Sequence, residues 1–320
     1  MPSFLHEASS VNPSEDKMDS VLQEPTPIGS PTSETVTVSV STAFHPASHS
    51  DVYIPDLIIR SSDRVFFHVH RDHLIRASTN SFNYLVSTSD SASAPGSAPV
   101  VPLPETSDVI NVVFHVIYKQ SCSQYNPSLA VLIASIMTLK KYGISLGEHI
   151  NPTAPLFPIL LTQAPMHAIE LYMVAAENDL RDLAVAVSPH LLSFHLPTVN
   201  DEMAARMGPI YLKKLFFLHI NRTHILQELM LTPPVSHPPT FDCGIDQQQR
   251  TTRAWALSCA SLAWDARPDL SPTRMQNVLG TMESQLTCEL CRASVDARIQ
   301  QLMSEWALAQ EAHNVQYTEL

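Results

Sequence analysis

Apolar residues recur at every second position in two neighbouring stretches. "DLIIR" (residues 56–60) is rich in β-branched residues and is followed by the turn-forming "SSD". "VFFHVH" (65–70) then places Val65, Phe67 and Val69 on one face of an extended chain. The two stretches predict a β-hairpin whose second strand has one buried face.

Helical spacing of apolar residues replaces this alternation further along the chain. Residues 71–86 predict two short helices that meet one core, and "VVPLPE" (100–105) predicts a strand that its prolines place at a sheet edge. A cap signal at Thr106 or Ser107 opens the next predicted helix. A further apolar stripe over 129–139 ends before Gly143, a candidate C-cap.

The second half of the chain is predicted to be helical. A helix pair is predicted from residue 164, with Pro165 near its first turn. The next predicted helix, 209–230, has an inward stripe of Leu212, Leu215, Phe216, His219 and Ile220. After a proline-rich break, apolar stripes over 275–282 and 295–306 predict a small helical unit. Its expected aromatic anchors are Trp255, Trp264 and Trp306.

These patterns divide the chain into four parts. Residues 1–50 are rich in Ser, Thr and Pro and predict a disordered tail, because they contain too little apolar surface to offset chain entropy. Within it "TVTVSVSTAF" (35–44) alternates and could pair as a strand, but a flexible tail is the preferred interpretation. The compact parts are predicted at 51–147, 152–231 and 240–313.

Composition narrows the classes of function. The formal net charge of −12 and a charged fraction of 16% argue against nucleic acid as a partner. The longest apolar stretch (128–139) is too short to span a bilayer and no signal peptide is visible, so we expect an intracellular protein, cytoplasmic or nuclear, that does not bind membranes. The 7 glycines form neither a phosphate-binding loop nor a nucleophile elbow. We therefore expect no catalytic residue, no cofactor and no small-molecule substrate.

Three histidines crowd the exit of the second predicted strand. His68 and His70 share a face, whereas His73 lies beyond the strand in the turn that opens the helix. No cysteine or acidic pair in the run completes a four-ligand metal site. Polar residues on a partly exposed sheet face are the preferred interpretation.

Four of the five cysteines lie in the C-terminal part. Cys288 and Cys291 have the spacing of half a zinc site, whereas Cys243 and Cys259 are separated from each other and from that pair. His237 could join as a ligand only if the proline-rich loop folds back. The preferred interpretation is small buried residues and no metal; a zinc-binding or thiol-dependent protein is the alternative.

The order "PDLIIRSSDRVFFHVHRDHLIRAST..F", then "LPE", then "FHVIY" resembles the BTB/POZ domain, in the divergent form found in mushroom-forming fungi. The similarity covers roughly residues 52–143. It departs from the family upstream, where 16–24 is the only candidate for the amphipathic helix that tightly dimerising members carry. The residues after Tyr118 also replace the family's usual glycine-containing turn.

The resemblance implies an α+β fold, with a BTB core followed by a mainly helical extension and a small C-terminal helical unit. It implies a non-catalytic adaptor or self-association protein. Asp56 and Arg71 match positions of a charged patch near the family's dimer face, where the alternative is an ordinary exposed ion pair. His70 with Arg71 matches the exit of the second strand into the core helix, and the resemblance makes Asp56, His70 and Arg71 the candidate interaction residues. The implied partners are proteins: a second copy of the chain, or a cullin-type ubiquitin ligase scaffold contacted through 165–194.

Overall fold

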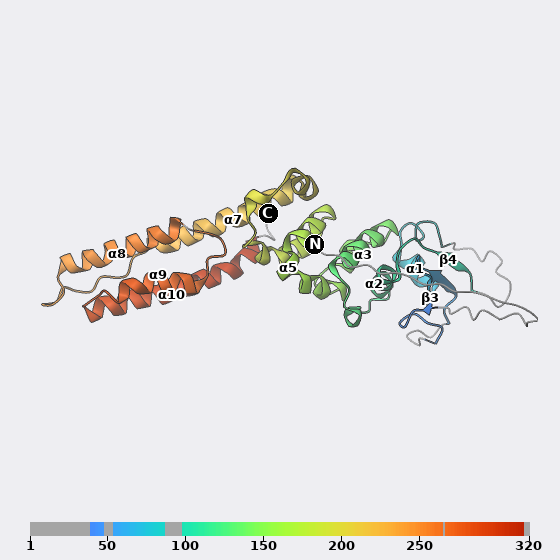
Figure 1. Cartoon of the computed structure of the whole chain (residues 1–320), viewed down its shortest axis with the longest axis horizontal. Helices are drawn as coiled ribbons and strands as arrows, with labels where there is room; N and C mark the ends of the chain where they lie inside the picture. The colour runs from blue at the N-terminus through green and yellow to red at the C-terminus, as the bar shows by residue number, and fades with distance from the viewer. Residues whose placement is uncertain (1–38, 48–53, 87–97, 265, 317–320) are drawn as a thin grey trace, which may run out of the picture. The chain divides into compact units, whose positions relative to one another are not determined.

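A computed structural model describes residues 39–47, 54–86, 98–264 and 266–316 (Figure 1). The fold is mixed α+β, with a small four-stranded sheet near the beginning of the described chain and helices over most of the rest. The α+β class predicted from the sequence is therefore confirmed. Residues 1–38, most of the predicted tail, lie outside the described residues.

The sheet has the strand order β1-β3-β2-β4. Strands β2 (Leu57–Arg60) and β3 (Val65–Val69) pair antiparallel, which confirms the predicted hairpin. Strand β4 (Val100–Pro102) runs parallel to β2 at one edge, where its proline costs no ladder hydrogen bond. Strand β1 (Ser39–Val40) runs parallel to β3 at the other edge.

Strand β1 changes the predicted start of the ordered chain. It lies inside the segment that we predicted as tail, and Phe44 just after it is only 4% exposed. The Phe44 ring contacts the rings of Phe67 and Phe114, and its carbonyl accepts the His68 N–H at 2.9 Å. Within the alternating pattern of 35–44, Ser39 and Val40 thus form a strand.

Helix α1 (Arg71–Ala77) follows β3 as predicted, but the second predicted helix is a left-handed turn. Ser81 to Tyr84 all have φ between 52° and 61°. Left-handed backbone costs about 1–2 kcal/mol per residue. Burial of Phe82 offsets this cost, since its ring stacks on Tyr142 at 4.1 Å. The Ser78 hydroxyl also accepts the Phe82 N–H at 2.7 Å.

Helices α2 (Ser107–Ile117) and α3 (Leu129–Lys141) pack against each other beside the sheet. The predicted α2 stripe is buried throughout: Val109, Val112, Val113, Val116 and Ile117. Gly143 ends α3 as predicted, with a φ of 69° that a side chain would strain. The 3₁₀ turn η1 (Ser123–Tyr125) joins α2 to α3, and the short α4 (Leu146–His149) follows.

Helix α5 (Leu156–Glu177) begins earlier than predicted. Pro165 lies inside it, and the backbone departs from helical geometry at His167. The stretch therefore consists of two helical segments across a kink, as a proline inside a helix requires. By length and mean hydropathy alone, α5 is the one helix in the described parts that could cross a bilayer, and 44% of its apolar window is buried within the fold.

The chain then forms α6 (Arg181–Val187), the 3₁₀ turns η2 (Ser188–Leu191) and η3 (Leu196–Thr198), and α7 (Asp201–Leu231). Helix α7 kinks at Gly208, before Pro209. Its predicted inward stripe is wrong for Phe216 and Ile220, which are 39% and 56% exposed. Leu215 and His219 are buried as predicted, and the other buried residues of α7 are Met207, Tyr211, Leu218, Arg222, Leu226 and Met230.

Three helices complete the described chain: α8 (Ile245–Trp264), α9 (Pro272–Glu283) and α10 (Glu289–Gln316). They form a second core, in which Trp255 and Trp306 are each 2% exposed and act as predicted anchors. The prediction for Trp264 is wrong, because this side chain is 92% exposed near the end of α8. The second core also takes Leu226 and Met230 from α7, so α7 serves both cores.

Candidate functional site

The predicted interaction residues Asp56 and Arg71 lie together at the start of α1. The Asp56 carboxylate accepts the Arg71 backbone N–H at 2.8 Å, and the two side chains form a long ion pair at 3.9 Å. The first N–H groups of a helix have no partner within the helix, so Asp56, which stands just before β2, caps the start of α1. The Asp56 side chain is 57% exposed, so it caps the helix and still offers charge at the surface.

His70 is fixed by Tyr118 at the end of α2. The Tyr118 hydroxyl accepts the His70 backbone N–H at 2.8 Å and lies 2.9 Å from His70 Nδ1. These two contacts hold the His70 side chain in one orientation against Tyr118.

The other two histidines of the cluster point to different neighbours. The His73 ring stacks on the Tyr118 ring at 4.6 Å, with an angle of 6° between their planes. His68 is partly buried on the sheet, and this burial, with the nearby His45, lowers its pKa. The cluster therefore divides: His70 and His73 contact Tyr118, and His68 takes a separate position on the sheet.

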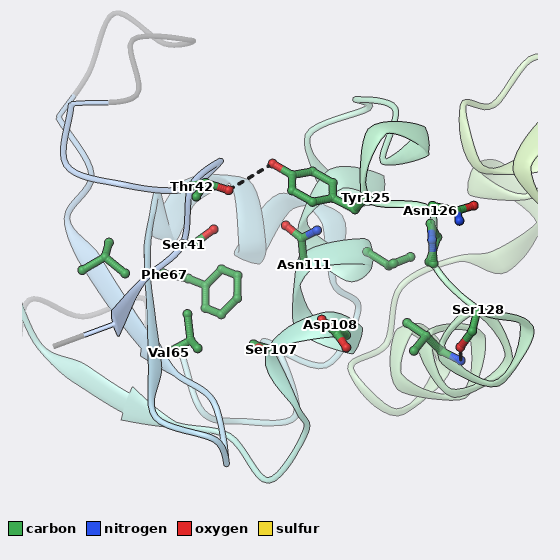
Figure 2. A pocket seen from close by; sticks show the side chains of 14 residues that line it. Ser41, Thr42, Val65, Phe67, Ser107, Asp108, Asn111, Tyr125, Asn126 and Ser128 are labelled. Atoms are coloured by element: carbon green, nitrogen blue, oxygen red, sulfur yellow. Dashed lines mark hydrogen bonds between the residues drawn. The ribbon is translucent and has the colours of Figure 1, made fainter. Parts of the chain in front are cut away.

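A groove of about 480 Å³ lies between strand β1, the start of α2 and the segment 125–131 (Figure 2). Val65 and Phe67 supply apolar side chains, and Asp108 and Asn111 supply polar ones from α2. Tyr125 closes one end with a 3.5 Å hydrogen bond to Thr42. The sequence analysis did not predict this groove, because Val40, Ser41 and Thr42, which line one side of it, fall in the segment that was predicted as tail.

The proline-rich loop folds back, which is the condition that the sequence analysis set for His237. It brings His237 to Cys288 and Cys291 at the start of α10, and Cys243 joins them from the turn before α8. Cys259 stays outside this group, buried in α8, where burial raises its pKa to about 11. We call the four residues His237, Cys243, Cys288 and Cys291 the Cys₃His cluster.

The four possible ligand atoms of the Cys₃His cluster lie within 4.8 Å of one another. His237 Nε2 is 3.3 Å from Cys291 Sγ and 3.4 Å from Cys288 Sγ. Cys243 Sγ is 3.6 Å from Cys291 Sγ. Cys243 and Cys291 are buried, while His237 and Cys288 are partly exposed.

Backbone groups near the Cys₃His cluster orient His237 and favour the thiolate form of Cys288. His237 Nδ1 lies 2.7 Å from the Pro238 carbonyl, which only accepts, so Nδ1 carries the proton and Nε2 turns a lone pair toward the thiols. Cys288 stands just before the first turn of α10, where the backbone N–H of Cys291 lowers its pKa to about 7. Burial, by contrast, raises the pKa of Cys243.

Comparison with known proteins finds no matching family model, no similar curated protein and no similar solved structure. The function proposed below is therefore argued from this chain alone, together with the resemblance that its sequence suggests.

Proposed function

We propose that the chain is a non-catalytic protein–protein interaction module, acting as an adaptor or self-association protein of BTB type. The observation that supports this most directly is the order of elements around the sheet. The β2–β3 hairpin leads into α1, β4 returns parallel to β2, and α2 and α3 then pack together. This is the order that the resemblance implies. The proposed partners are a second copy of the chain or a cullin-type ubiquitin ligase scaffold.

The proposed contact face contains Asp56, His70 and Arg71. Each is held by a backbone hydrogen bond or a ring contact to the rest of the fold. A face that is fixed before binding loses little conformational entropy when a partner docks. The partly exposed Asp56 and Arg71 would supply charges for selecting that partner.

Exposed apolar side chains on α7 also support an interaction role. Ile210, Phe217 and Ile220 are 66%, 46% and 56% exposed, and their spacing places them on one face of the helix. Lys213 lies over the Phe217 ring at 5.5 Å. Contiguous apolar side chains on a surface are typical of contacts with another protein.

Two buried histidines, His115 on α2 and His219 on α7, each have a hydrogen-bond partner within the fold. His115 Nδ1 donates to the Asn111 carbonyl at 2.7 Å, and His219 Nε2 donates to the Leu191 carbonyl at 2.9 Å. Burial lowers the pKa of both side chains, which favours the neutral form. Each histidine donates to a carbonyl of the fold, which supports a non-catalytic role.

The test is light scattering on the full chain across a concentration series. The change is Arg71→Glu, which places two carboxylates side by side at the start of α1. We expect a wild-type dimer and a rise in its dissociation constant of about tenfold or more, equivalent to ~1.4 kcal/mol. The matched control is Arg76→Glu on the same helix, where the wild-type side chain is 79% exposed and pairs with Asp72.

We expect the control to change the dissociation constant by no more than about threefold, since isolated surface ion pairs contribute little. Equal effects of the two variants would remove the contact face from the proposal. A strict monomer that also fails to bind a purified cullin scaffold would contradict the function itself.

A further inference from the structure

We propose that His237, Cys243, Cys288 and Cys291 bind one Zn²⁺ ion, and that this ion has a structural role. It would fasten the proline-rich segment that follows α7 to the start of α10. The inference does not depend on the proposed interaction function, because the Cys₃His cluster lies in the second core and Asp56, His70 and Arg71 lie in the first.

The distances between the possible ligand atoms fit a tetrahedral ion. With Zn–S bonds of about 2.3 Å and Zn–N bonds of about 2.05 Å, a regular tetrahedron separates two sulfurs by about 3.8 Å and a sulfur from a nitrogen by about 3.5 Å. Three of the six distances are 3.6 Å for Cys243 Sγ to Cys291 Sγ, and 3.3 and 3.4 Å from His237 Nε2 to Cys291 Sγ and Cys288 Sγ. Each is within about 0.3 Å of the value that zinc requires.

The chemistry of the donors selects the metal and its role. Three thiolates and one imidazole in a tetrahedral arrangement favour Zn²⁺ over the hard cations Mg²⁺ and Ca²⁺, which prefer oxygen. Four protein ligands leave no open position for water or a substrate, which is the pattern of structural rather than catalytic zinc. The Pro238 carbonyl accepts a hydrogen bond from His237 Nδ1, the ring nitrogen that would not bind the metal, and so fixes the orientation of the ring.

The segment between α7 and the cluster is held along one face of α10. Arg298 donates to the Leu229 and Thr232 carbonyls, at 2.6 and 3.0 Å. One helical turn earlier, Ser294 donates to the Val235 carbonyl at 2.7 Å. His237 and Cys291 come next in the same antiparallel order.

Residues 291, 294 and 298 share one face of α10. The contacts from Arg298, Ser294 and Cys291 to the segment therefore form a single row along that face. A zinc ion at its far end would hold the final residues of the segment. The prolines of the segment lack backbone donors, so few backbone hydrogen bonds are available to do this. The Cys₃His cluster thus stands at the end of a segment that has few backbone hydrogen bonds, where a metal ion would cross-link it to α10.

The first test measures zinc in the full chain, purified under reducing conditions without a chelator or a histidine tag. We expect about one zinc ion per chain, as a four-ligand structural site holds. Cys243→Ser and His237→Ala should each reduce the zinc content several-fold. Cys259→Ser is the matched control, because Cys259 is buried in the same core but lies outside the cluster. Its zinc content should equal that of the wild type.

A second measurement guards against variants that fail to fold, and it uses the wild type alone. The metal-free chain is titrated with Co²⁺ without oxygen, and then alkylated with and without one equivalent of Zn²⁺. We expect the visible absorption of tetrahedral thiolate-bound Co²⁺, saturating at one equivalent. We also expect Zn²⁺ to slow alkylation of Cys243, Cys288 and Cys291, identified by peptide mapping.

Protons offer a third readout, since each thiol must lose one to become a ligand. Zn²⁺ binding should therefore release protons into a weakly buffered solution. The proposal is overturned if the reduced wild-type chain binds no Co²⁺ and its cysteines alkylate at the same rate with and without Zn²⁺. It is also overturned if Cys259→Ser loses as much zinc as Cys243→Ser.

Discussion

The two cores of this chain are built from different kinds of contact. The first is mainly apolar and centres on aromatic rings, with Phe114 touching Phe44, Phe67 and Phe82. The second has two buried arginines, Arg222 and Arg298, which are 2% and 6% exposed. A core of the first kind needs only matching apolar faces, whereas one of the second kind needs directed hydrogen bonds.

The hydrogen bonds of Arg298, together with one from Trp255, converge on the end of α7. The last carbonyls of a helix have no partner within it. Here Arg298 donates to the Leu229 carbonyl at 2.6 Å, and Trp255 Nε1 donates to the Met230 carbonyl at 3.2 Å. The second core thus uses long side chains from α8 and α10 to cap the helix that it shares with the first core.

The chain allows the two cores to be followed separately. Its 3 tryptophans, Trp255, Trp264 and Trp306, all lie in the second core or on its surface. Tryptophan fluorescence therefore reports unfolding of the second core, while far-ultraviolet circular dichroism reports both. The predictions below for Phe114, Arg298 and Arg222 use this difference.

The largest expected effect is that of Phe114→Ala in the first core. Truncating a fully buried phenylalanine removes apolar contacts and leaves a cavity, which costs about 3–5 kcal/mol. Urea unfolding should shift to lower concentration by circular dichroism. If the cores unfold independently, tryptophan fluorescence will shift much less. Phe217→Ala, at an exposed position on α7, should stay within about 0.5 kcal/mol of the wild type.

The next effect is that of Arg298→Met in the second core. The change leaves the Leu229 and Thr232 carbonyls without their donor, at a cost of about 2–3 kcal/mol. The fluorescence transition should shift by this amount. Arg253→Met, at an exposed position on α8, is the control and should leave it unchanged. A loss below about 0.5 kcal/mol in Arg298→Met would show that water replaces the guanidinium there.

A smaller and pH-dependent effect is expected at Tyr142. Its hydroxyl donates to Glu105 at 2.6 Å, and burial together with this carboxylate raises its pKa well above the ordinary value of 10. The unfolded chain deprotonates Tyr142 near pH 10 while the folded chain does not. The stability from this shift is therefore complete below pH 10, and it falls by up to ~1.4 kcal/mol per pH unit above it.

Tyr142→Phe should cost about 1–2 kcal/mol at neutral pH, because it removes a hydrogen bond to a charged group. Above pH 10 its stability should fall less steeply than that of the wild type, as measured by urea unfolding from pH 8 to pH 11. Tyr211→Phe is the comparison, since burial and Asp179 also raise the pKa of Tyr211. Parallel curves for Tyr142→Phe and the wild type would contradict the assignment.

The smallest effect is expected at Arg222. Its guanidinium stacks 3.3 Å from the centre of the Trp306 ring and donates from Nη2 to the Trp306 carbonyl. Two nitrogens, Nε and Nη1, have no hydrogen-bond partner among the described residues, and burial lowers its pKa to about 10. Removing a poorly satisfied buried charge is often neutral or stabilising.

Arg222→Met should therefore change stability by less than about 1 kcal/mol in either direction, once the lost contact with the ring is included. The same fluorescence measurement that detects Arg298→Met checks this. A loss as large as that of Arg298→Met would mean that the two buried arginines contribute equally, and the distinction between them would fail.

Local pattern was enough to predict much of the first core. Alternation placed Phe67 and Val69 on the buried face of β3, and helical spacing placed the whole α2 stripe correctly. Both signals work because each element buries one face against a neighbour. The left-handed turn at 81–84 escaped prediction because it depends on the stack of Phe82 on Tyr142, sixty residues away in sequence.

The second half was harder, because polar side chains take part in its cores. Along α7 the buried positions include Tyr211 and Arg222, whose polar groups led the spacing of apolar residues to leave them out of the predicted buried face. The predicted face therefore included Phe216 and Ile220, which are exposed. The Cys₃His cluster shows the same limit. The Cys288–Cys291 spacing was visible, but the approach of His237 across 51 residues depends on how the proline-rich segment runs along α10.

The sharing of α7 bears on how the chain folds as it leaves the ribosome. The first core is closed by residues up to Leu218, and the second begins with Leu226 on the same helix. Domains fold from the N-terminus during synthesis, and starting a helix costs more than extending one. The part of α7 that belongs to the second core therefore needs no separate nucleation. The first core already holds the N-terminal part of α7 as a helix, and the later residues of α7 extend that helix as they emerge.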